Sequence, residues 1–360
     1  MSTLGVRTGA LGAGDIGALG ERAMTAPQSH AGELTVARLR EVALVLGAFQ
    51  RRVAQDEVVQ GEVARSAGAH GAGAHGEEAH AGGAESDARR YVRRVSGGPL
   101  VEVGPGTVHV LLGLAHPAAF VAADASRLVN RYVRPLLAAL TKLGQKANFF
   151  GRDWISVAKR PVAWVGFAHD AGSGRAVLEA FIAVATPFAT GDRTARASFL
   201  GKAPATLEEV LGRAVDLDAL IETIARAYVD AYACTRADLA PWASSGSDGP
   251  YGSSEPDEPA PEVATDPPWA ATAETIIGTV AAGPDARGIF RVGGDFLASR
   301  DAVVRLEREL AELPEGAGAD GIHRVHELVE AAFTAPDVAL EGVRSPASIA
   351  DVIVRARTPR

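Results

Sequence analysis

The chain has 360 residues, of which 47% are apolar and 22% charged, so we expect a globular protein of two or three domains. Its formal net charge of −8 argues against a general binder of nucleic acid or anionic membranes, and no apolar run is long enough to span a membrane. The single cysteine excludes an internal disulfide, and the N-terminus does not resemble a signal peptide. We therefore expect a cytoplasmic protein.

Residues 1–32 are rich in small and polar side chains and are predicted to form a tail with one helix, near residues 15–24. Gly12, Gly14 and Gly17 in this tail match the glycine pattern of a dinucleotide-binding turn. That motif needs a strand before it and a helix after it, and no strand is predicted there. We therefore interpret the match as chance.

Residues 33–242 are predicted to form an α+β domain of catalytic size. Runs rich in Val and Leu predict its strands, and apolar residues at helical spacing predict its helices. The predicted strands are residues 33–39, 42–49, 91–95, 107–112, 154–158, 162–168 and 177–184, and the predicted helices are residues 128–140, a helix that begins at 206, and residues 217–233. Pro135 is expected to kink the first helix or to mark a boundary, and Thr206 with Glu209 forms a capping box.

Two low-complexity segments interrupt the chain. Residues 66–88 consist mainly of Gly, Ala, His and Glu and predict a disordered insertion, whereas the Pro-, Ser- and acid-rich residues 243–268 predict a linker. Residues 269–360 then predict a smaller α+β unit. Its predicted elements are a strand at 288–292, helices near 299–313 and 322–333, and a last helix that begins at Ser345 and Pro346.

The histidine patterns do not indicate a metal site. His70, His75 and His80 are five residues apart, a spacing that shares no helix or strand face, and no cysteine or carboxylate spacing supports zinc. His323 and His326 are neighbours on a predicted helix, where a solvated surface is the better interpretation. We therefore predict no metal bound by protein side chains alone.

The strongest candidate site is a glycine turn that follows two arginines. Arg93 and Arg94 lie in a predicted strand, and Ser96, Gly97 and Gly98 form the turn after it. Glycine lets a phosphate approach backbone N–H groups closely, and arginine neutralises its charge. The pattern predicts a phosphate-binding turn, and an ordinary hairpin with solvated arginines is the alternative.

A second candidate site lies further along the chain. Asp153 opens a predicted strand, and Lys159 and Arg160 end it; only four lysines occur in the whole sequence. A fixed lysine can hold a carboxylate and a phosphate together and stabilise the charge of a forming acyl phosphate. The alternative is again the solvated end of a hairpin.

In this order, these motifs resemble the lipoate–protein ligase family, within the biotin/lipoate protein ligase superfamily. The glycine turn is similar to the family's Arg-Arg-x-Ser-Gly-Gly-Gly signature, and residues 151–160 resemble its Asn-Asp motif and lysine loop. Gly294, Asp295 and Phe296 resemble a motif of the family's C-terminal accessory domain. The similarity covers nearly the whole chain apart from the N-terminal tail and the two low-complexity segments.

The resemblance implies a fold and a reaction. The implied fold is α+β, with a mixed sheet flanked by helices over residues 33–242 and a small accessory domain over residues 269–360. The implied reaction uses ATP and Mg²⁺ to convert lipoate or octanoate into an acyl-AMP, from which the acyl group passes to a lysine of a lipoyl carrier domain. The implied partners are carrier domains of 2-oxoacid dehydrogenase complexes or the H-type protein of glycine cleavage, without nucleic acid or membrane.

The resemblance also implies site residues. Lys159 is the implied catalytic residue, and Arg160 is an equally good match to the family's lysine. The implied substrate- and ATP-binding residues are Arg93, Arg94, Ser96, Gly97, Gly98, Val101, Asp153 and Arg160. Asp153 is expected to assist metal or adenine binding.

The sequence departs from the family pattern within the site itself. Pro99 replaces the third glycine and removes one N–H donor, Val103 stands where the family usually has histidine, and no glycine follows Lys159. Two alternatives therefore stay open: a catalytically degenerate homologue that binds an acyl carrier or cofactor, and an octanoyl transferase of the same superfamily. A transferase acting through a cysteine needs Cys234 in the acyl pocket, whereas its sequence context favours a buried structural thiol.

Overall fold

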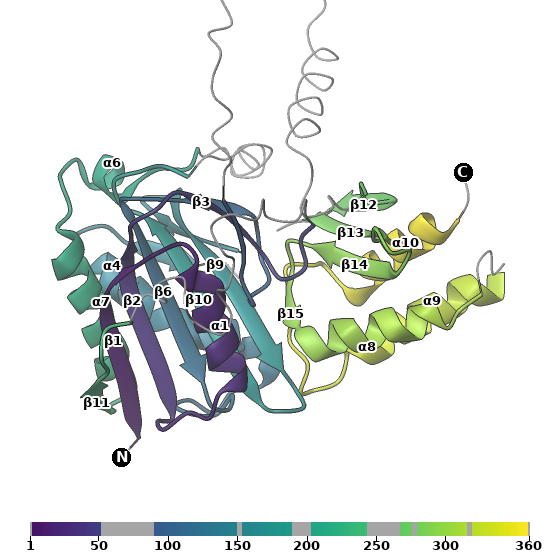
Figure 1. Cartoon of the computed structure of the whole chain (residues 1–360), viewed down its shortest axis with the longest axis horizontal. Helices are drawn as coiled ribbons and strands as arrows, with labels where there is room; N and C mark the ends of the chain where they lie inside the picture. The colour runs from purple at the N-terminus through teal and green to yellow at the C-terminus, as the bar shows by residue number, and fades with distance from the viewer. Residues whose placement is uncertain are drawn as a thin grey trace, which may run out of the picture.

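The computed structural model describes residues 2–51, 90–149, 153–188, 203–242, 267–275, 279–314 and 319–358. The predicted insertion at 66–88 and nearly all of the predicted linker at 243–268 lie outside these residues. The described residues form a mixed α+β structure, as the sequence predicts, with a large sheet and a smaller C-terminal unit beside it (Figure 1).

A ten-stranded sheet is the centre of the fold. Its main path runs β11-β1-β2-β6-β10-β9-β15-β16, and β7 and β8 extend it beside β9. The strands are β1 (Thr3–Leu11), β2 (Gly32–Leu39), β6 (Thr107–Leu114), β7 (Ala147–Phe149), β8 (Trp154–Val157), β9 (Arg160–Asp170), β10 (Arg175–Ala183), β11 (Thr235–Asp238), β15 (Leu297–Ser299) and β16 (Leu340–Glu341). The strands predicted within residues 33–39, 107–112, 154–158, 162–168 and 177–184 are confirmed.

One face of this sheet is covered by helices. They are α3 (Leu128–Tyr132), α4 (Arg134–Thr141), α6 (Leu207–Leu211) and α7 (Leu217–Ala231), with a 3₁₀ turn at Ala125–Arg127. Pro135 lies in the first turn of α4, so it marks a helix boundary as predicted. The Thr206 side chain accepts a hydrogen bond from the Glu209 N–H, which confirms the N-terminal cap. The apolar faces of α4 and α7 join the sheet in the largest core.

The opposite face carries α1 (Asp15–Thr25) and a small three-stranded sheet. That sheet pairs β3 (Ala43–Leu46) with β4 (Tyr91–Arg93) and β5 (Val101–Val103). Large aromatic side chains of the central sheet, among them Trp164 and Phe181, fill the core between the layers. This second core lies beneath the predicted glycine turn.

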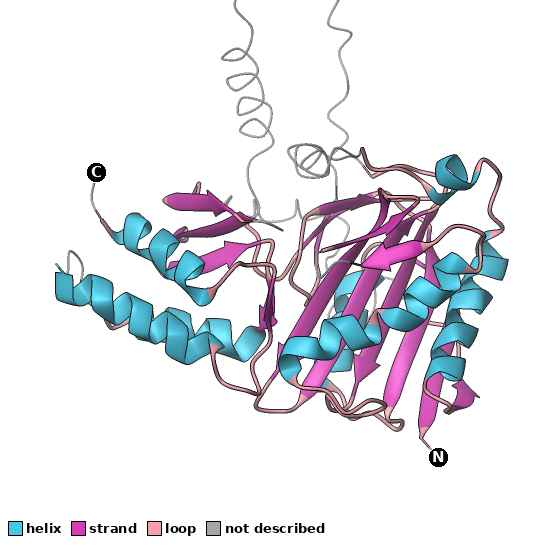
Figure 2. Cartoon of the chain, turned by 180° about the vertical axis from the view of Figure 1, so that it is seen from behind, coloured by secondary structure: helices cyan, strands magenta, loops and turns pink. Residues whose placement is uncertain are grey.

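The C-terminal unit has its own core of a small sheet and three helices. Its elements are β12 (Ala271–Glu274), β13 (Thr279–Pro284), β14 (Phe290–Gly294), α8 (Arg300–Ala311), α9 (Ala319–Phe333) and α10 (Pro346–Arg357). Two short strands tie this unit to the central sheet, because β15 pairs in parallel with β9 and β16 pairs with β15 (Figures 1 and 2). The units are therefore joined by backbone hydrogen bonds as well as by the chain.

The N-terminal segment is not the tail that the sequence predicts. Thr3–Leu11 forms β1, which pairs in parallel with both β2 and β11 inside the central sheet. Arg7 on this strand is 9% exposed, donates to the Ala240 carbonyl and stacks on Trp242. The strand was not predicted because a charged residue, Arg7, interrupts a run that contains glycines. In the structure the Ala240 carbonyl and the Trp242 ring stabilise this charge.

Candidate functional site

The glycine turn is held by carbonyl groups of the protein itself. The Gly97 N–H donates to the Phe167 carbonyl of β9 at 2.8 Å, and the Gly98 N–H donates to the Phe296 carbonyl of the C-terminal unit at 3.2 Å. Gly98 has φ +101°, a conformation that suits glycine. The two amides expected to face phosphate are therefore already engaged.

The two arginines that precede the turn also bind main-chain carbonyls. Arg93 Nη1 donates to Gly47 at 3.2 Å and to Gln50 at 2.7 Å. Arg94 is 2% exposed, and its Nη2 donates to Gly97 at 3.2 Å and to Pro99 at 2.8 Å. These contacts fix the loops around the turn, so both arginines have a structural role here.

A buried polar network lies under the turn. The Ser96 hydroxyl donates to Glu179, and His109 Nε2 lies 2.7 Å from Glu179 Oε1. Arg94 Nε lies 4.0 Å from Glu179 Oε2, and the charge of buried Asp153 also acts on Arg94. Burial alone would raise the pKa of Glu179, but His109, Arg94 and Ser96 together hold it below its ordinary value. The network thus keeps an ionised carboxylate inside the core.

Sequence reasoning missed Glu179 and His109. Each interrupts the apolar interior of a strand, Glu179 in β10 and His109 in β6. That interruption of a buried strand is the signal that could have found them, because a buried charge needs a partner. The structure joins them with Arg94, Ser96 and Asp153, three of the predicted site residues.

Lys159 does not approach the glycine turn. It lies in the tight turn between β8 and β9, where it is exposed and has φ +68°. Phe167, which holds Gly97, is seven residues along β9 from Arg160, or roughly 23 Å. Arg160 instead donates to the Pro204 carbonyl at 2.9 Å and pairs with Glu209. The two candidate sites of the sequence therefore lie apart in the structure.

Val101 is likewise not part of an open site. It lies on β5, is 1% exposed and pairs with Val45 of β3. The Trp154 and Trp164 rings meet edge to face in the same core, with centroids 6.0 Å apart. Val101 therefore packs in a filled core with these side chains.

The accessory-domain motif, in contrast, does meet the glycine turn. Besides the Phe296 carbonyl on Gly98, the Phe296 ring stacks on Phe49 with centroids 4.9 Å apart. Asp295 Oδ1 accepts a hydrogen bond from Gln50 Nε2 at 2.6 Å. Gly294 precedes this contact at the end of β14, with φ +132°. Sequence analysis identified both the glycine turn and the accessory-domain motif, but it did not predict that the two are in contact.

A cleft of about 440 Å³ lies where α1, the β3 and β4 ends and the C-terminal unit meet. Its described lining residues include three carboxylates and five arginines. Two of the arginines, Arg93 and Arg94, belong to the predicted site. The arginines are Arg51, Arg93, Arg94, Arg291 and Arg300, and the carboxylates are Glu21, Asp285 and Glu307. This cleft is large enough for a small ligand.

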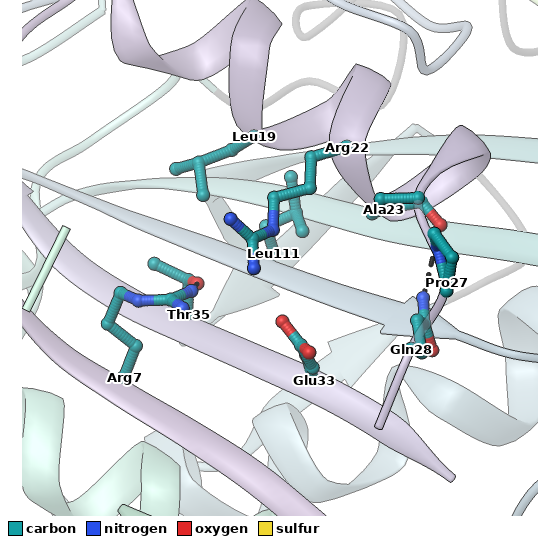
Figure 3. Close-up of a pocket in the computed structure, with 10 residues that line it drawn as sticks. Arg7, Leu19, Arg22, Ala23, Pro27, Gln28, Glu33, Thr35 and Leu111 are labelled. Carbon is teal, nitrogen blue, oxygen red and sulfur yellow. Dashed lines mark hydrogen bonds between the residues drawn. The ribbon is translucent and has the colours of Figure 1, made fainter. Parts of the chain in front are cut away.

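A second hollow, between α1 and strands β1 and β2, is much smaller. Figure 3 shows Arg7, Arg22 and Glu33 pointing into it. Its volume of about 20 Å³ suits one water molecule, not a nucleotide or an acyl chain.

The glycine pattern at the start of α1 follows a strand, contrary to the reason given for dismissing it, but it has a packing role. A Cβ on Gly17 would lie 2.7 Å from the Arg93 carbonyl. The neighbouring Gly12 N–H donates to Asp15, and the Ala13 N–H donates to Glu41. Carboxylates of the chain therefore already occupy the place where a phosphate would bind.

Two further sequence expectations concern metal and thiol chemistry. Within the described ranges, no group of three or more His, Cys, Asp or Glu side chains is placed to hold a metal ion. Asp153 is 2% exposed and its charge acts on that of buried Arg94, which does not suit a Mg²⁺ site. Cys234 packs in the core beneath α7, and burial raises the pKa of its thiol, which does not favour a nucleophilic thiolate.

Comparisons with known proteins give the fold. No protein-family model and no curated protein matches the chain. Among solved structures, lipoate-bound LipL1 of P. falciparum matches with TM-score 0.51 and 11% identity over 90% of this chain and 94% of that one. A bipartite lipoate protein ligase of Thermoplasma acidophilum, studied with its E2 lipoyl domain, gives TM-score 0.45 and 12% identity over 66% of this chain and 88% of that one. Lipoate-protein ligase A bound with ATP gives TM-score 0.45 and 13% identity over 67% of this chain and 90% of that one. The chain has the lipoate–protein ligase fold.

Within this lipoate–protein ligase fold, the glycine turn bonds to β9 and the C-terminal unit, and the lysine of the β8–β9 turn lies at the opposite end of β9. The described part of the chain includes no helix long and apolar enough to cross a membrane.

Proposed function

We propose that the chain is a binding protein of the lipoate–protein ligase fold that does not activate an acyl group. Its expected ligands are lipoate or octanoate and a lipoyl carrier domain. The observation that supports this proposal is the occupation of the Gly97 and Gly98 amides by the Phe167 and Phe296 carbonyls. An acyl-adenylate needs donors that are free to meet its developing charge.

The remaining chemistry of the site points the same way. Arg94 and Asp153 are each 2% exposed, so neither side chain is open to a phosphate or a Mg²⁺ ion. Lys159 lies in a solvated turn roughly 23 Å along β9 from the glycine turn. A catalytic lysine must touch the reacting atoms, so Lys159 does not serve as one in this arrangement.

The test compares activation with binding. The full-length protein is incubated with lipoate or octanoate, ATP, Mg²⁺ and labelled pyrophosphate, and acyl-dependent label exchange into ATP is measured. We expect no exchange, but measurable binding of lipoate or of a lipoyl carrier domain by calorimetry. Acyl-dependent exchange would overturn the absence of activation, and failure of lipoate, octanoate and carrier domains to bind would overturn the binding function.

The second candidate is the ligase reaction itself, with ATP, Mg²⁺ and a lipoyl domain or H-type protein as acceptor. One observation favours it: the Gly98 amide is held by the C-terminal unit, so separation of the two units would release that donor. Acyl-dependent exchange in the wild type that Lys159→Ala abolishes would assign this function. Exchange that survives Lys159→Ala would assign the ligase to other residues.

A further inference from the structure

One helical surface of the chain carries positive charge only. Between residues 125 and 149 the sequence has five cations and neither Asp nor Glu, although the whole chain has a formal net charge of −8. The cations are Arg127, Arg131, Arg134, Lys142 and Lys146. A segment of one charge sign in an acidic protein attracts anionic partners, and it is absent from the site described above.

Most of these cations form one stripe on the outer side of α3 and α4. The Val133 N–H donates to the Val129 carbonyl and the Leu137 N–H to the Val133 carbonyl, which carries one helix into the next. Positions 127, 131, 134, 138 and 142 follow the helical repeat, and each is exposed or half-buried. The apolar side chains of both helices pack in the largest core, so this stripe, roughly 22 Å long, is the outer face of the helices.

A sixth cation joins the end of the stripe. Arg213, in the turn between α6 and α7, donates to the Leu143 carbonyl at 3.1 Å, beside the residues that carry Lys142 and Lys146. The ion pairs among the described residues, such as Arg38 with Asp218, include none of the six cations. Like charges one helical turn apart repel one another, so the free protein bears a repulsion that an acidic partner would relieve.

The charge of the neighbouring helix limits the shape of that partner. α7 packs beside α4, and its charged residues are three carboxylates, Asp218, Glu222 and Asp230, and one cation, Arg226. A long polyanion such as RNA, or a flat anionic membrane, would extend from the stripe onto these carboxylates and be repelled by them. A compact acidic segment, about as wide as one helix, would meet the cations alone.

We propose that the α3–α4 stripe is a docking surface for an acidic segment of a partner protein. The stripe lies on the face of the central sheet opposite α1 and the glycine turn (Figure 1). A carrier domain that presents its lysine to the glycine turn would leave the stripe uncovered. The proposal therefore goes beyond the proposed function and does not depend on it.

The test measures the binding of a fluorescent acidic peptide to the full-length protein by anisotropy. The peptide has about fifteen residues, to match the length of the stripe, and carries one glutamate on each helical turn. A peptide with glutamine in place of every glutamate is the control. We expect the acidic peptide to bind at low salt and to bind at least about tenfold more weakly at high salt, and we expect the glutamine peptide not to bind.

Charge-reversal variants locate the binding. Arg131→Glu with Arg134→Glu is expected to weaken peptide binding by about tenfold or more, because two attractive contacts become repulsive. The matched control, Arg226→Glu with Arg308→Glu, changes the net charge equally at two exposed arginines outside the stripe and should change binding by less than about twofold. Arg131→Gln should leave the melting temperature unchanged or raise it, because it removes like-charge repulsion.

Several outcomes would overturn the proposal. One is the absence of binding by the acidic peptide at low salt, and another is an equal effect of the two double variants. A short single-stranded RNA and vesicles of anionic phospholipid are titrated in parallel, and tighter binding of either than of the peptide would assign the stripe to nucleic acid or membrane instead. Lipoate binding by Arg131→Glu with Arg134→Glu should equal that of the wild type, so failure of this proposal is distinguishable from failure of the proposed function.

Discussion

Arg94 Nε and Glu179 Oε2 lie 4.0 Å apart, with each side chain 1% exposed, directly beneath the glycine turn. In a buried pair, loss of one partner leaves the other charge unpaired in the core, which costs more than loss of both. The Glu179 carboxylate also accepts a hydrogen bond from Ser96 and lies within hydrogen-bond distance of His109, so it stabilises the base of the turn through several partners.

We therefore predict that Glu179→Gln lowers the free energy of unfolding by about 3–5 kcal/mol. Chemical denaturation measures it. The double variant Arg94→Met with Glu179→Met is expected to be less destabilised than the sum of the two single variants. Additive losses would show that the pair has no coupling of its own.

The same pair gives stability a pH dependence. Because the pKa of Glu179 lies below its ordinary value, its contribution is fully present above the unfolded-state pKa and is lost as pH falls through the folded one. The difference in stability between wild type and Glu179→Gln should therefore shrink on acidification. A difference that stays constant from neutral to acid pH would contradict an ionised carboxylate in the core.

Gly166 allows the glycine turn to lie against β9. A Cβ at this position would collide with Ser96 Oγ and lie 2.9 Å from the Gly97 carbonyl. We predict that Gly166→Ala destabilises the protein by about 1–3 kcal/mol through overpacking. Gly172→Ala, whose nearest neighbour would be 3.5 Å away, is the control and should change stability by less than about 0.5 kcal/mol. Equal effects on thermal unfolding would contradict the close packing.

Local patterns in the sequence predict most of the fold but little of the site. Continuous apolar runs locate β6, β9 and β10, which are buried along nearly their whole length, and helical spacing of apolar residues locates α4 and α7. β1 was not predicted because Arg7 places a charge within it. The residue that covers this charge, Trp242, is 235 residues away in the sequence, so a local pattern does not reveal it. The Glu179–His109 pair is formed by strand register, which single-chain patterns do not encode.

Motifs also identify residues without fixing their partners. Arg93, Arg94 and the glycines have the composition of a phosphate site, but the atoms that meet them are the carbonyls of distant segments such as Phe296. The expectation for Lys159 had the same weakness, since a lysine at the end of a strand is equally a turn residue. The backbone conformation distinguishes the two roles.

That conformation yields a prediction for Lys159. Its φ of +68° is costly for a side chain with a Cβ, so Lys159→Gly should be neutral or should stabilise the protein by up to about 1 kcal/mol. Thermal unfolding measures the effect. A large loss of stability would contradict the turn role.

Glu341 on β16 gives the junction of the two units a second pH dependence. It faces Leu297 in the β15–β16 pairing, and burial raises its pKa to about 7. The folded protein then binds this proton more tightly than the unfolded chain, so the stability due to Glu341 falls as pH rises from the ordinary carboxyl range to about 7. Glu341→Gln is therefore expected to raise the melting temperature above pH 7 and to change it little at pH 5. Glu330→Gln, exposed on α9, is the control. If the variant and the wild type have the same melting temperature at every pH, the Glu341 carboxyl is solvated and its ionisation does not destabilise β16.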